Sequence, residues 1–331
     1  MTAVIVRMLL RGLIAVGLLT WLTLSQNVDW PKTFSRLTSI NPVCLLVAVA
    51  AVAASHVLAI ESVRTLLLSR GVAIGFKRLL ANHFRGLFAA QFLPTPVAGD
   101  IVRVHDLHSG QPTPGPSLHH FEGPNLVWQS AAWALAVQRA LNLLASLLIF
   151  VVVVEAAQFE DLFPIRTAAV SILLAVACGL TLLIWVPRLT TAPMVKTFLI
   201  WTPPYRIVLQ TFSLGLAQQA ALIAAVLAVA NGLEIDVSTT RLVATVPLSL
   251  VAIILPVSVS GLGVRESVYV FVLTSDGVPA SDAVTLSLSI FGLALIFSLL
   301  GLLTPVRKTQ SNSQLPSSSM ANPQLKEQPF S

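Results

Sequence analysis

The feature that most constrains this chain is a series of apolar runs that approach the length of about 20 residues needed for a helix to cross a bilayer. Six runs are expected to span a membrane: 8–24, 43–60, 131–154, 168–186, 207–230 and 283–303. Only 10% of the residues are charged, whereas soluble domains carry roughly 25%. Because helices satisfy their own backbone hydrogen bonds in lipid, the sequence predicts an all-α polytopic membrane protein.

Charges in the connecting segments alternate between basic and acidic along the chain. The basic segments are 61–78, 187–206 and 307–308, and the acidic segments are 155–167, 231–241 and 274–282. Since basic loops stay in the cytoplasm, we expect both termini to be cytoplasmic. The net charge of +6 is therefore interpreted as a topology signal, and no nucleic-acid partner is expected.

One short segment occurs twice, at positions about half a chain apart. Residues 93–103 read LPTPVAGDIVR and residues 255–265 read LPVSVSGLGVR, and Leu, Pro, Val, Gly, Val and Arg coincide at a constant offset of 162 residues. Both copies interrupt an apolar run with Pro and Gly, which is typical of the broken helices at transporter binding sites. The residues expected to shape these interruptions are Pro94, Gly99, Pro256, Gly261 and Gly263.

The charge pattern predicts that each copy lies in a hairpin that re-enters the membrane. Residues 79–126 must begin and end on one side, and residues 242–276 must begin and end on the opposite side. We therefore expect an inverted repeat of three spans plus one hairpin, with six spans and two hairpins in all. The units are residues 1–154 with hairpin 79–103, residues 168–306 with hairpin 242–273, and a polar cytoplasmic tail, residues 307–331, that is expected to be disordered. The alternative is eight crossings in which the two segments are ordinary Pro-kinked spans.

Arg139 is the charged residue that an apolar span tolerates least. An arginine near the centre of a bilayer costs roughly 3 kcal/mol unless a partner or water stabilises it. Asn142 and Ser146 follow at helical spacing, so one polar stripe runs along an otherwise apolar helix. Because guanidinium groups bind phosphate through two parallel hydrogen bonds, an anionic ligand is a natural partner.

Arg103 and Arg265 end the two repeated segments, and acidic residues lie close to both. Asp100 and Glu266 are the neighbouring acids. The arginines are expected to bind the anionic ligand, or to pair with these acids and fix the hairpins, or to do both. The two carboxylates are alternatively candidates for carrying protons, since burial favours their neutral form.

No pattern of catalytic residues emerges from the sequence. It contains no Ser-His-Asp or Cys-His arrangement and no phosphate-binding loop of the Walker type, so an enzyme is not expected. The histidines between residues 105 and 120 have no common metal-ligand spacing, and neither cysteine has one. We expect no metal and no other cofactor.

The two repeated segments resemble the signatures of the lysylphosphatidylglycerol synthase transmembrane-region family, also called flippase-like integral membrane proteins. The resemblance extends to about Leu303, and its more specific part is Gly261-Leu-Gly-Val-Arg-Glu266. It implies an inner-membrane protein that moves or presents charged or glycosylated lipids. Some members carry a fused aminoacyl-transferase domain, for which the polar tail leaves no room.

Three departures from the family pattern bear on the site. Ala98 replaces one of two glycines that usually precede the acid of the first segment. In the third span, Gln138 and Arg139 replace the usual pairing of an acid with an arginine, which leaves Arg139 less neutralised. The Pro- and His-rich stretch 105–124 is unlike the usual short connection.

The function that these observations favour is translocation of a lipid with an anionic headgroup, a phospholipid or a polyprenyl-phosphate-linked lipid, across the cytoplasmic membrane. Two alternatives remain: transport of a small soluble anion or osmolyte, and a non-catalytic scaffold for a lipid-modifying enzyme. The residues expected to contact the ligand are Asp100, Arg103, Arg139, Asn142, Arg265 and Glu266.

Overall fold

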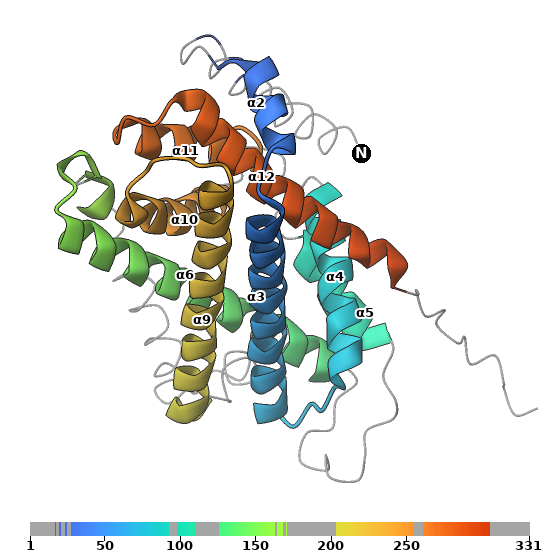
Figure 1. Ribbon diagram of the computed structural model, residues 1–331. Coiled ribbons are helices and arrows are strands. Elements are labelled where there is room, and N and C mark those ends of the chain that lie inside the picture. Colours follow the sequence, from blue (N-terminus) through green and yellow to red (C-terminus); the bar gives the residue numbers. More distant parts are fainter. Residues whose placement is uncertain are drawn as a thin grey trace, which may run out of the picture.

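The computed structural model describes residues 28–92, 98–109, 126–162, 203–254 and 261–304, with a few further positions between 17 and 24 and between 164 and 170. All regular elements in these residues are helices, as expected of an all-α protein (Figure 1). They are α2 (Trp30–Thr38), α3 (Pro42–Ser69), α4 (Phe76–Phe92), α5 (Ala98–Ser109), α6 (Leu126–Ala157), η2 (Glu160–Leu162), α9 (Tyr205–Gly232), α10 (Thr239–Ile254), α11 (Val264–Thr274), α12 (Ala280–Leu299) and η3 (Leu300–Leu303).

Four of the six predicted spans lie within the described residues, and all four are helices long and apolar enough to cross a membrane. These are α3, α6, α9, and α12 together with η3. Each helix extends beyond its predicted apolar run, because the backbone continues into flanking polar residues that cap it or lie at the membrane surface. The predicted spans 8–24 and 168–186 lie almost wholly outside the described residues.

Helix α2 lies in the segment between the first two predicted spans, 8–24 and 43–60, where no helix was predicted. Asp29 caps it by accepting a hydrogen bond from the Lys32 backbone N–H at 3.1 Å, and Pro31 follows in its first turn, where the missing N–H has no cost. An ion pair between Arg36 and Asp282 joins α2 to the beginning of α12. The helix therefore rests against the end of the bundle, as Figure 1 shows.

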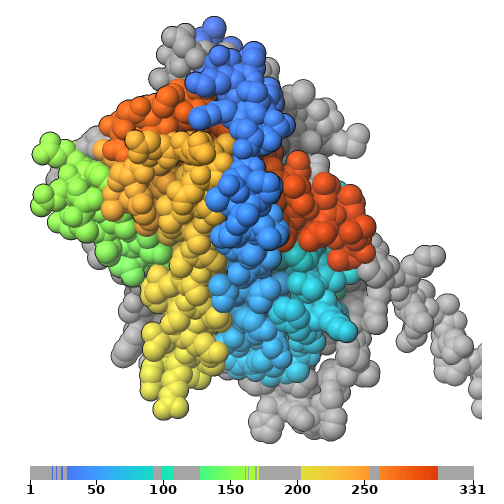
Figure 2. All heavy atoms as spheres, viewed as in Figure 1, coloured from blue at the N-terminus to red at the C-terminus, as the bar shows by residue number. Residues whose placement is uncertain are grey.

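Helices α3 and α9 lie side by side along most of their lengths and form the front of the molecule (Figure 2). At one end the Asn41 N–H donates to the Gly232 carbonyl at 3.0 Å. A Cβ on Gly232 would lie 2.8 Å from the Cys44 Cβ, so the glycine permits this close approach. Cys44 thus serves as a small packing residue at the contact between the two helices.

The repeated segments each separate two helices that pack against each other: α4 with α5, and α10 with α11. Residues 93–97 and 255–260, which include Pro94 and Pro256, lie outside the described residues. The beginning of α4 meets the end of α5, since Arg78 Nη2 donates to the Leu107 carbonyl at 3.0 Å. Likewise Arg241 at the beginning of α10 lies 3.8 Å from the Asp276 carboxylate that follows α11. Each helix pair is therefore a hairpin.

The first hairpin is longer than predicted from the sequence. Its second helix, α5, continues to Ser109, so His105 and Asp106 lie in this helix, beyond the predicted hairpin end at residue 103. Asp106 is held there by Asn82 of α4, whose side-chain amide donates to its carboxylate at 3.1 Å. These polar contacts between helices offset the low hydrophobicity of the segment.

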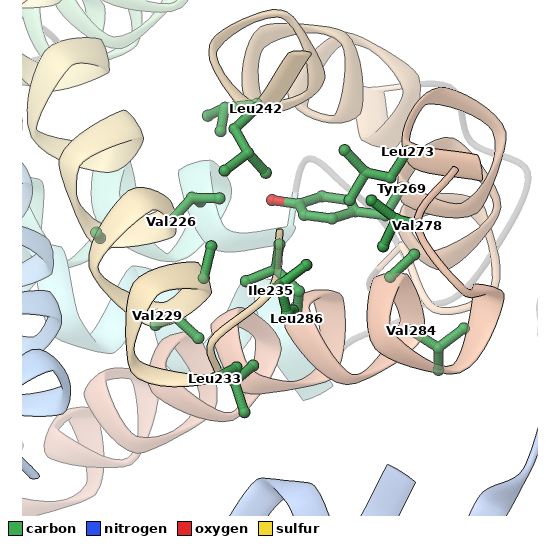
Figure 3. Close-up of a cluster of buried hydrophobic side chains, with 14 of the residues drawn as sticks. Val226, Val229, Leu233, Ile235, Leu242, Tyr269, Leu273, Val278, Val284 and Leu286 are labelled. Carbon is green, nitrogen blue, oxygen red and sulfur yellow. The ribbon is translucent and has the colours of Figure 1, made fainter. Parts of the chain in front are cut away.

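The second hairpin is anchored in the largest hydrophobic cluster of the described residues. Tyr269 of α11 is 1% exposed, and its ring lies across this cluster with the hydroxyl directed toward Val226 and Leu242 (Figure 3). The labelled members come from α9, α10, α11 and α12 and from the loops between them. Burial of such an aromatic side chain is worth about 2 kcal/mol or more, so α11 is fixed firmly to its neighbours.

The three acidic connecting segments gather at one end of the bundle. Arg241 stacks over the Phe159 ring at 4.1 Å and approaches Asp276, which brings segments 155–167, 231–241 and 274–282 together. The predicted grouping of the acidic segments is thus met by direct contacts between described residues, and the grouping of the basic segments stays a prediction.

Candidate functional site

Asp100, Arg103 and Arg139 form one charged cluster inside the bundle. The Arg139 Nε lies 2.6 Å from Asp100 Oδ2, and Arg103 Nη1 lies 3.8 Å from Asp100 Oδ1. Asp100 and Arg139 come from α5 and α6 and are 39 positions apart, so their pairing could not be predicted from the sequence. Two guanidinium groups therefore share one carboxylate, and the cluster carries a net positive charge.

Asp100 owes its position to the first turn of α5. A carboxylate there is stabilised by the positive end of the helix dipole. Gly99 lets this turn approach α4, because a Cβ at Gly99 would lie 2.5 Å from the Gly86 carbonyl oxygen and 2.9 Å from the Ala90 Cβ. The prediction that Gly99 shapes the hairpin backbone is thus given a physical reason.

Gly86 also leaves room for the Arg103 side chain. A Cβ at Gly86 would lie 2.5 Å from Arg103 Cγ and 2.8 Å from Cδ, so the arginine stem lies directly on the α4 backbone. Its guanidinium then reaches His83, with Nη2 lying 3.2 Å from His83 Nδ1, while the buried Nε has no hydrogen-bond partner. Arg103 is therefore held by packing and is only partly satisfied by hydrogen bonds.

Arg139 differs from Arg103 in its exposure. It lies near the middle of the 32-residue helix α6, yet half of its side chain is exposed, compared with 12% for Arg103 and 16% for Asp100. A cation at this depth in a membrane needs an anionic or hydrated partner on its open side. Arg139 is the member of the cluster best placed to contact a ligand.

The polar stripe predicted on the third span faces α9. Asn142 Nδ2 donates to Gln218 Oε1 at 3.0 Å, and Gln219 Nε2 donates to Ser146 Oγ at 2.6 Å. Gly215 allows the contact, since its Cβ would lie 3.0 Å from Asn142 Oδ1. Asn142 thus has a partner within the protein, and its predicted role in ligand binding is untested.

Arg265 and Glu266 lie on the second hairpin, where no described contact joins them to the first cluster. Glu266 is fully buried; its carboxylate accepts from the Gly263 N–H at 2.7 Å and from the Ser287 hydroxyl at 3.4 Å. The Arg265 guanidinium lies 5.7 Å from the centroid of the Phe291 ring, and its Nη1 is buried with no hydrogen-bond partner. Glu266 therefore caps α11 through Gly263, whereas Arg265 retains an unsatisfied donor.

Arg85 of α4 is engaged within the protein. It forms an ion pair with Asp106 in addition to its hydrogen bond with Thr304. Pinning of the first hairpin by an arginine and an acid was predicted for Arg103 with Asp100, which lie 3.8 Å apart. The pair of Arg85 with Asp106 was not predicted, because Asp106 was expected to lie beyond the hairpin end at residue 103.

Several polar residues were overlooked in the sequence: His83, which contacts the cluster, His56, which contacts His83, and Gln218 and Gln219, which contact the stripe. His56 occurs in the middle of an apolar run, and the adjacent glutamines interrupt another one. Because polar residues inside spans are rare and usually functional, this placement was a usable signal.

Two further observations concern metal binding and cavities in the described residues. His, Cys, Asp and Glu side chains in the described part do not gather in groups of three that would suit a metal ion. A cavity of about 170 Å³ lies at the end of α6, lined by Val154, Glu155, Gln158, Phe159, Glu160 and Arg166. This cavity is among the loops and not at the charged cluster, so it belongs to a different part of the molecule.

Comparison with known families decides the relationship. The sequence model described as "Lysylphosphatidylglycerol synthase TM region" matches residues 8–301. The chain belongs to this family. The match covers all the helices from α2 to α12, including both hairpins, and confirms the resemblance carried by the repeated segments. A comparison with curated proteins gave no match. Membership establishes a multi-pass membrane protein.

Proposed function

We propose that this protein translocates a lipid with an anionic headgroup, a phospholipid or a polyprenyl-phosphate-linked lipid, across the cytoplasmic membrane. The observation that carries the proposal is the half-exposed guanidinium of Arg139 in the middle of a spanning helix, next to the carboxylate of Asp100. A membrane protein that retains such a cation at a cost of several kcal/mol uses it for binding or for transport. The role is one of transport and needs no catalytic group.

The net charge of the cluster favours an anionic ligand. Arg103 and Arg139 contribute two positive charges against the single negative charge of Asp100. A phosphate group that approaches the open side of Arg139 would form charge-assisted hydrogen bonds that are strong in a medium of low dielectric constant. Acyl chains would stay in the bilayer while the headgroup crosses.

Helix packing supports the inverted repeat that such a transporter requires. The two halves can be compared by pairing α3 with α9, the α4–α5 hairpin with the α10–α11 hairpin, and α6 with α12. Under this pairing, the packing of α5 on α6 corresponds to the packing of α11 on α12. In the same way, the packing of α6 on α10 becomes that of α12 on α4, and that of α3 on α6 becomes that of α9 on α12. The open ends of the two hairpins also lie at opposite ends of the bundle. We infer two related halves with opposite orientation.

Alternating access then follows from rocking one half against the other. In this scheme Arg103 and Arg139 exchange partners between Asp100 and the ligand, and Arg265 supplies an equivalent cation from the second hairpin. By the positive-inside rule we assign the basic helix ends, and with them both termini, to the cytoplasm. Replacing Arg265 tests this scheme more stringently than replacing Arg103 or Arg139, because the buried Nη1 of Arg265 has no partner among the described residues.

A liposome experiment separates this function from its alternatives. Purified protein is reconstituted with fluorescent phosphatidylglycerol in one leaflet, and its movement is followed by quenching from outside. The proposal predicts movement of the lipid that falls at least tenfold in Arg139→Ala. Uptake of a soluble anion without lipid movement would favour the solute transporter instead, and neither activity would favour the scaffold for a lipid-modifying enzyme.

A matched control is available on the same helix. Trp128 of α6 is 48% exposed, so its replacement by leucine alters an open position without touching the charged cluster. Trp128→Leu should move lipid at the wild-type rate. Equal losses in Trp128→Leu and Arg139→Ala would mean that the arginine acts only through the stability of α6.

A further inference from the structure

A chain of polar side chains continues from the charged cluster into the core of the bundle. His83 of α4 contacts Arg103, and on its other side His83 Nε2 lies 3.1 Å from Nδ1 of His56 in α3. His56 is near the centre of the spanning helix α3. Direct contacts thus join four helices, in the spatial order Arg139, Asp100, Arg103, His83 and His56.

Donor and acceptor chemistry assigns the proton positions in this histidine pair. A guanidinium can only donate, so His83 Nδ1 must accept from Arg103 Nη2. A neutral His83 then carries its proton on Nε2 and donates it to His56 Nδ1. His56 consequently carries its own proton on Nε2, an atom that is buried with no hydrogen-bond partner. As long as Arg103 stays in place, the pair is neutral and has no free basic nitrogen.

The surroundings of the pair leave Arg103 as its controlling charge. The His56 ring packs against Phe84 at 5.7 Å and against Phe297 of α12 at 5.1 Å between centroids. The other charged residues on α3, α4 and the helices packed against them fall into two groups. Some form ion pairs of their own: Glu61 with Arg64, Arg85 with Asp106, and Asp282 with Arg36. The rest lie toward helix ends: Lys77 and Arg78 in the first turn of α4, Glu155 near the end of α6, and Arg206 near the beginning of α9.

Protonation of the pair requires Arg103 to move. A proton on His83 Nδ1 would face the Arg103 N–H groups and add a second positive charge at 3.2 Å. Asp100 is the nearby acceptor, because its Oδ1 is already 3.8 Å from Arg103 Nη1. Arg139 already shares this carboxylate through Oδ2, however, so the pair of Arg103 with Asp100 strengthens when Arg139 turns to another anion.

We propose that the pair formed by His56 and His83 binds one proton when Arg139 takes up its anionic ligand, so that proton and ligand bind cooperatively. The inference rests on the proposed function and adds the coupling ion to it. The proton enters at His83 Nδ1, Arg103 moves to Asp100, and Arg139 turns to the ligand. One proton and one singly charged anion leave the net charge of the site unchanged. By linkage, each strengthens the binding of the other by the same factor.

The coupling can be tested without any ligand. Full-length protein labelled with ¹⁵N-histidine is placed in nanodiscs, and the histidine signals are followed by NMR as pH changes. Single replacements, His56→Gln and His83→Gln, assign the two signals among the six histidines. In Arg139→Gln, Asp100 is free for Arg103, so the titration midpoint of the pair should rise by about one pH unit or more. Trp128→Leu, on the same helix and outside the cluster, should leave it unchanged.

A double replacement separates the proposed switch from simple electrostatics. In Asp100→Asn, Arg103 has no carboxylate to turn to, so adding Arg139→Gln should then leave the midpoint unmoved. Plain charge effects would instead give the same upward shift in both backgrounds. A shift of equal size with and without Asp100, or no shift in Arg139→Gln, refutes the coupling.

Calorimetry identifies the ligand in a separate step. Binding of dihexanoyl phosphatidylglycerol to wild-type protein is measured in two buffers that differ in ionisation enthalpy, with inorganic phosphate as the comparison probe. Proton uptake of up to one per bound lipid supports the inference, and binding without uptake overturns it. If neither probe binds although the NMR cycle is non-additive, the proposed function fails while the coupling between Arg139 and the histidine pair stands.

Discussion

Replacement of Gly99 by alanine tests whether α4 and α5 approach as closely as the charged cluster requires. The added Cβ would lie 2.5 Å from the Gly86 carbonyl oxygen, about 0.9 Å less than the 3.4 Å at which ordinary contact begins. A second clash, 2.9 Å from the Ala90 Cβ, acts in the same direction. Since the first of these atoms belongs to a helix backbone, the two helices must separate by nearly 1 Å.

The cost follows from the hydrogen bonds that join the two helices. Arg78 donates to the Leu107 carbonyl at 3.0 Å, and Asn82 donates to the Arg103 carbonyl at 2.8 Å. A separation of this size would break both, and each such bond contributes about 1 kcal/mol. We therefore expect Gly99→Ala to destabilise the protein by about 2 kcal/mol, which corresponds to a fall of about 3 °C in the unfolding midpoint.

Thermal unfolding of the detergent-solubilised protein measures this, with every variant heated at the same rate because membrane proteins often unfold irreversibly. Gly292 of α12 is the matched control, since a Cβ there meets no atom within 4 Å. Gly292→Ala should be neutral or stabilising by up to about 1 kcal/mol from helix propensity. Equal midpoints for Gly99→Ala and Gly292→Ala would show that the close approach of α4 and α5 does not exist.

Three further changes test other contacts. Removing the side chains of Asn142 and Gln218, singly and together, should give a coupling energy of about 0.6 kcal/mol in a double-mutant cycle, and a value of zero would mean that the bond joining α6 and α9 is absent. Glu266→Ala should lower stability by about 1–2 kcal/mol in the same melting assay, because the Gly263 N–H loses its acceptor; an unchanged midpoint would argue against the cap. Gly261→Ala places a side chain at a φ of +77°, which should cost about 1 kcal/mol, and wild-type stability would contradict this conformation.

The sequence predicted the four described spans and the two packed helix pairs well because both depend on local information. Apolar run length identifies a spanning helix, and the sign of loop charges assigns its ends. The bounds were less accurate, since α3 continues from the predicted end at residue 60 to Ser69. Helix α2 was missed because, with nine residues, it is too short and too polar to form a recognisable apolar run.

The partners in the candidate site could not be predicted from the sequence. Asp100 was expected to pair with Arg103, three positions away, yet its closer contact is with Arg139 of another helix. Which arginine lies closest to Asp100 depends on how α5 and α6 are rotated about their axes. This rotation cannot be read from a local stretch of sequence. His56 was likewise overlooked although it interrupts an apolar run, and its pairing with His83 could not be predicted because the two histidines are 27 positions apart.

The central claim is that the charged cluster binds an anionic lipid headgroup. Native mass spectrometry of the purified protein tests it most directly, with wild type compared to Arg103→Ala, Arg139→Ala and Arg265→Ala. We predict that wild type retains a specific anionic lipid and that all three variants lose it. If all four proteins carry the same mixture of bulk lipids, the arginines only hold the hairpins in place and the claim is wrong.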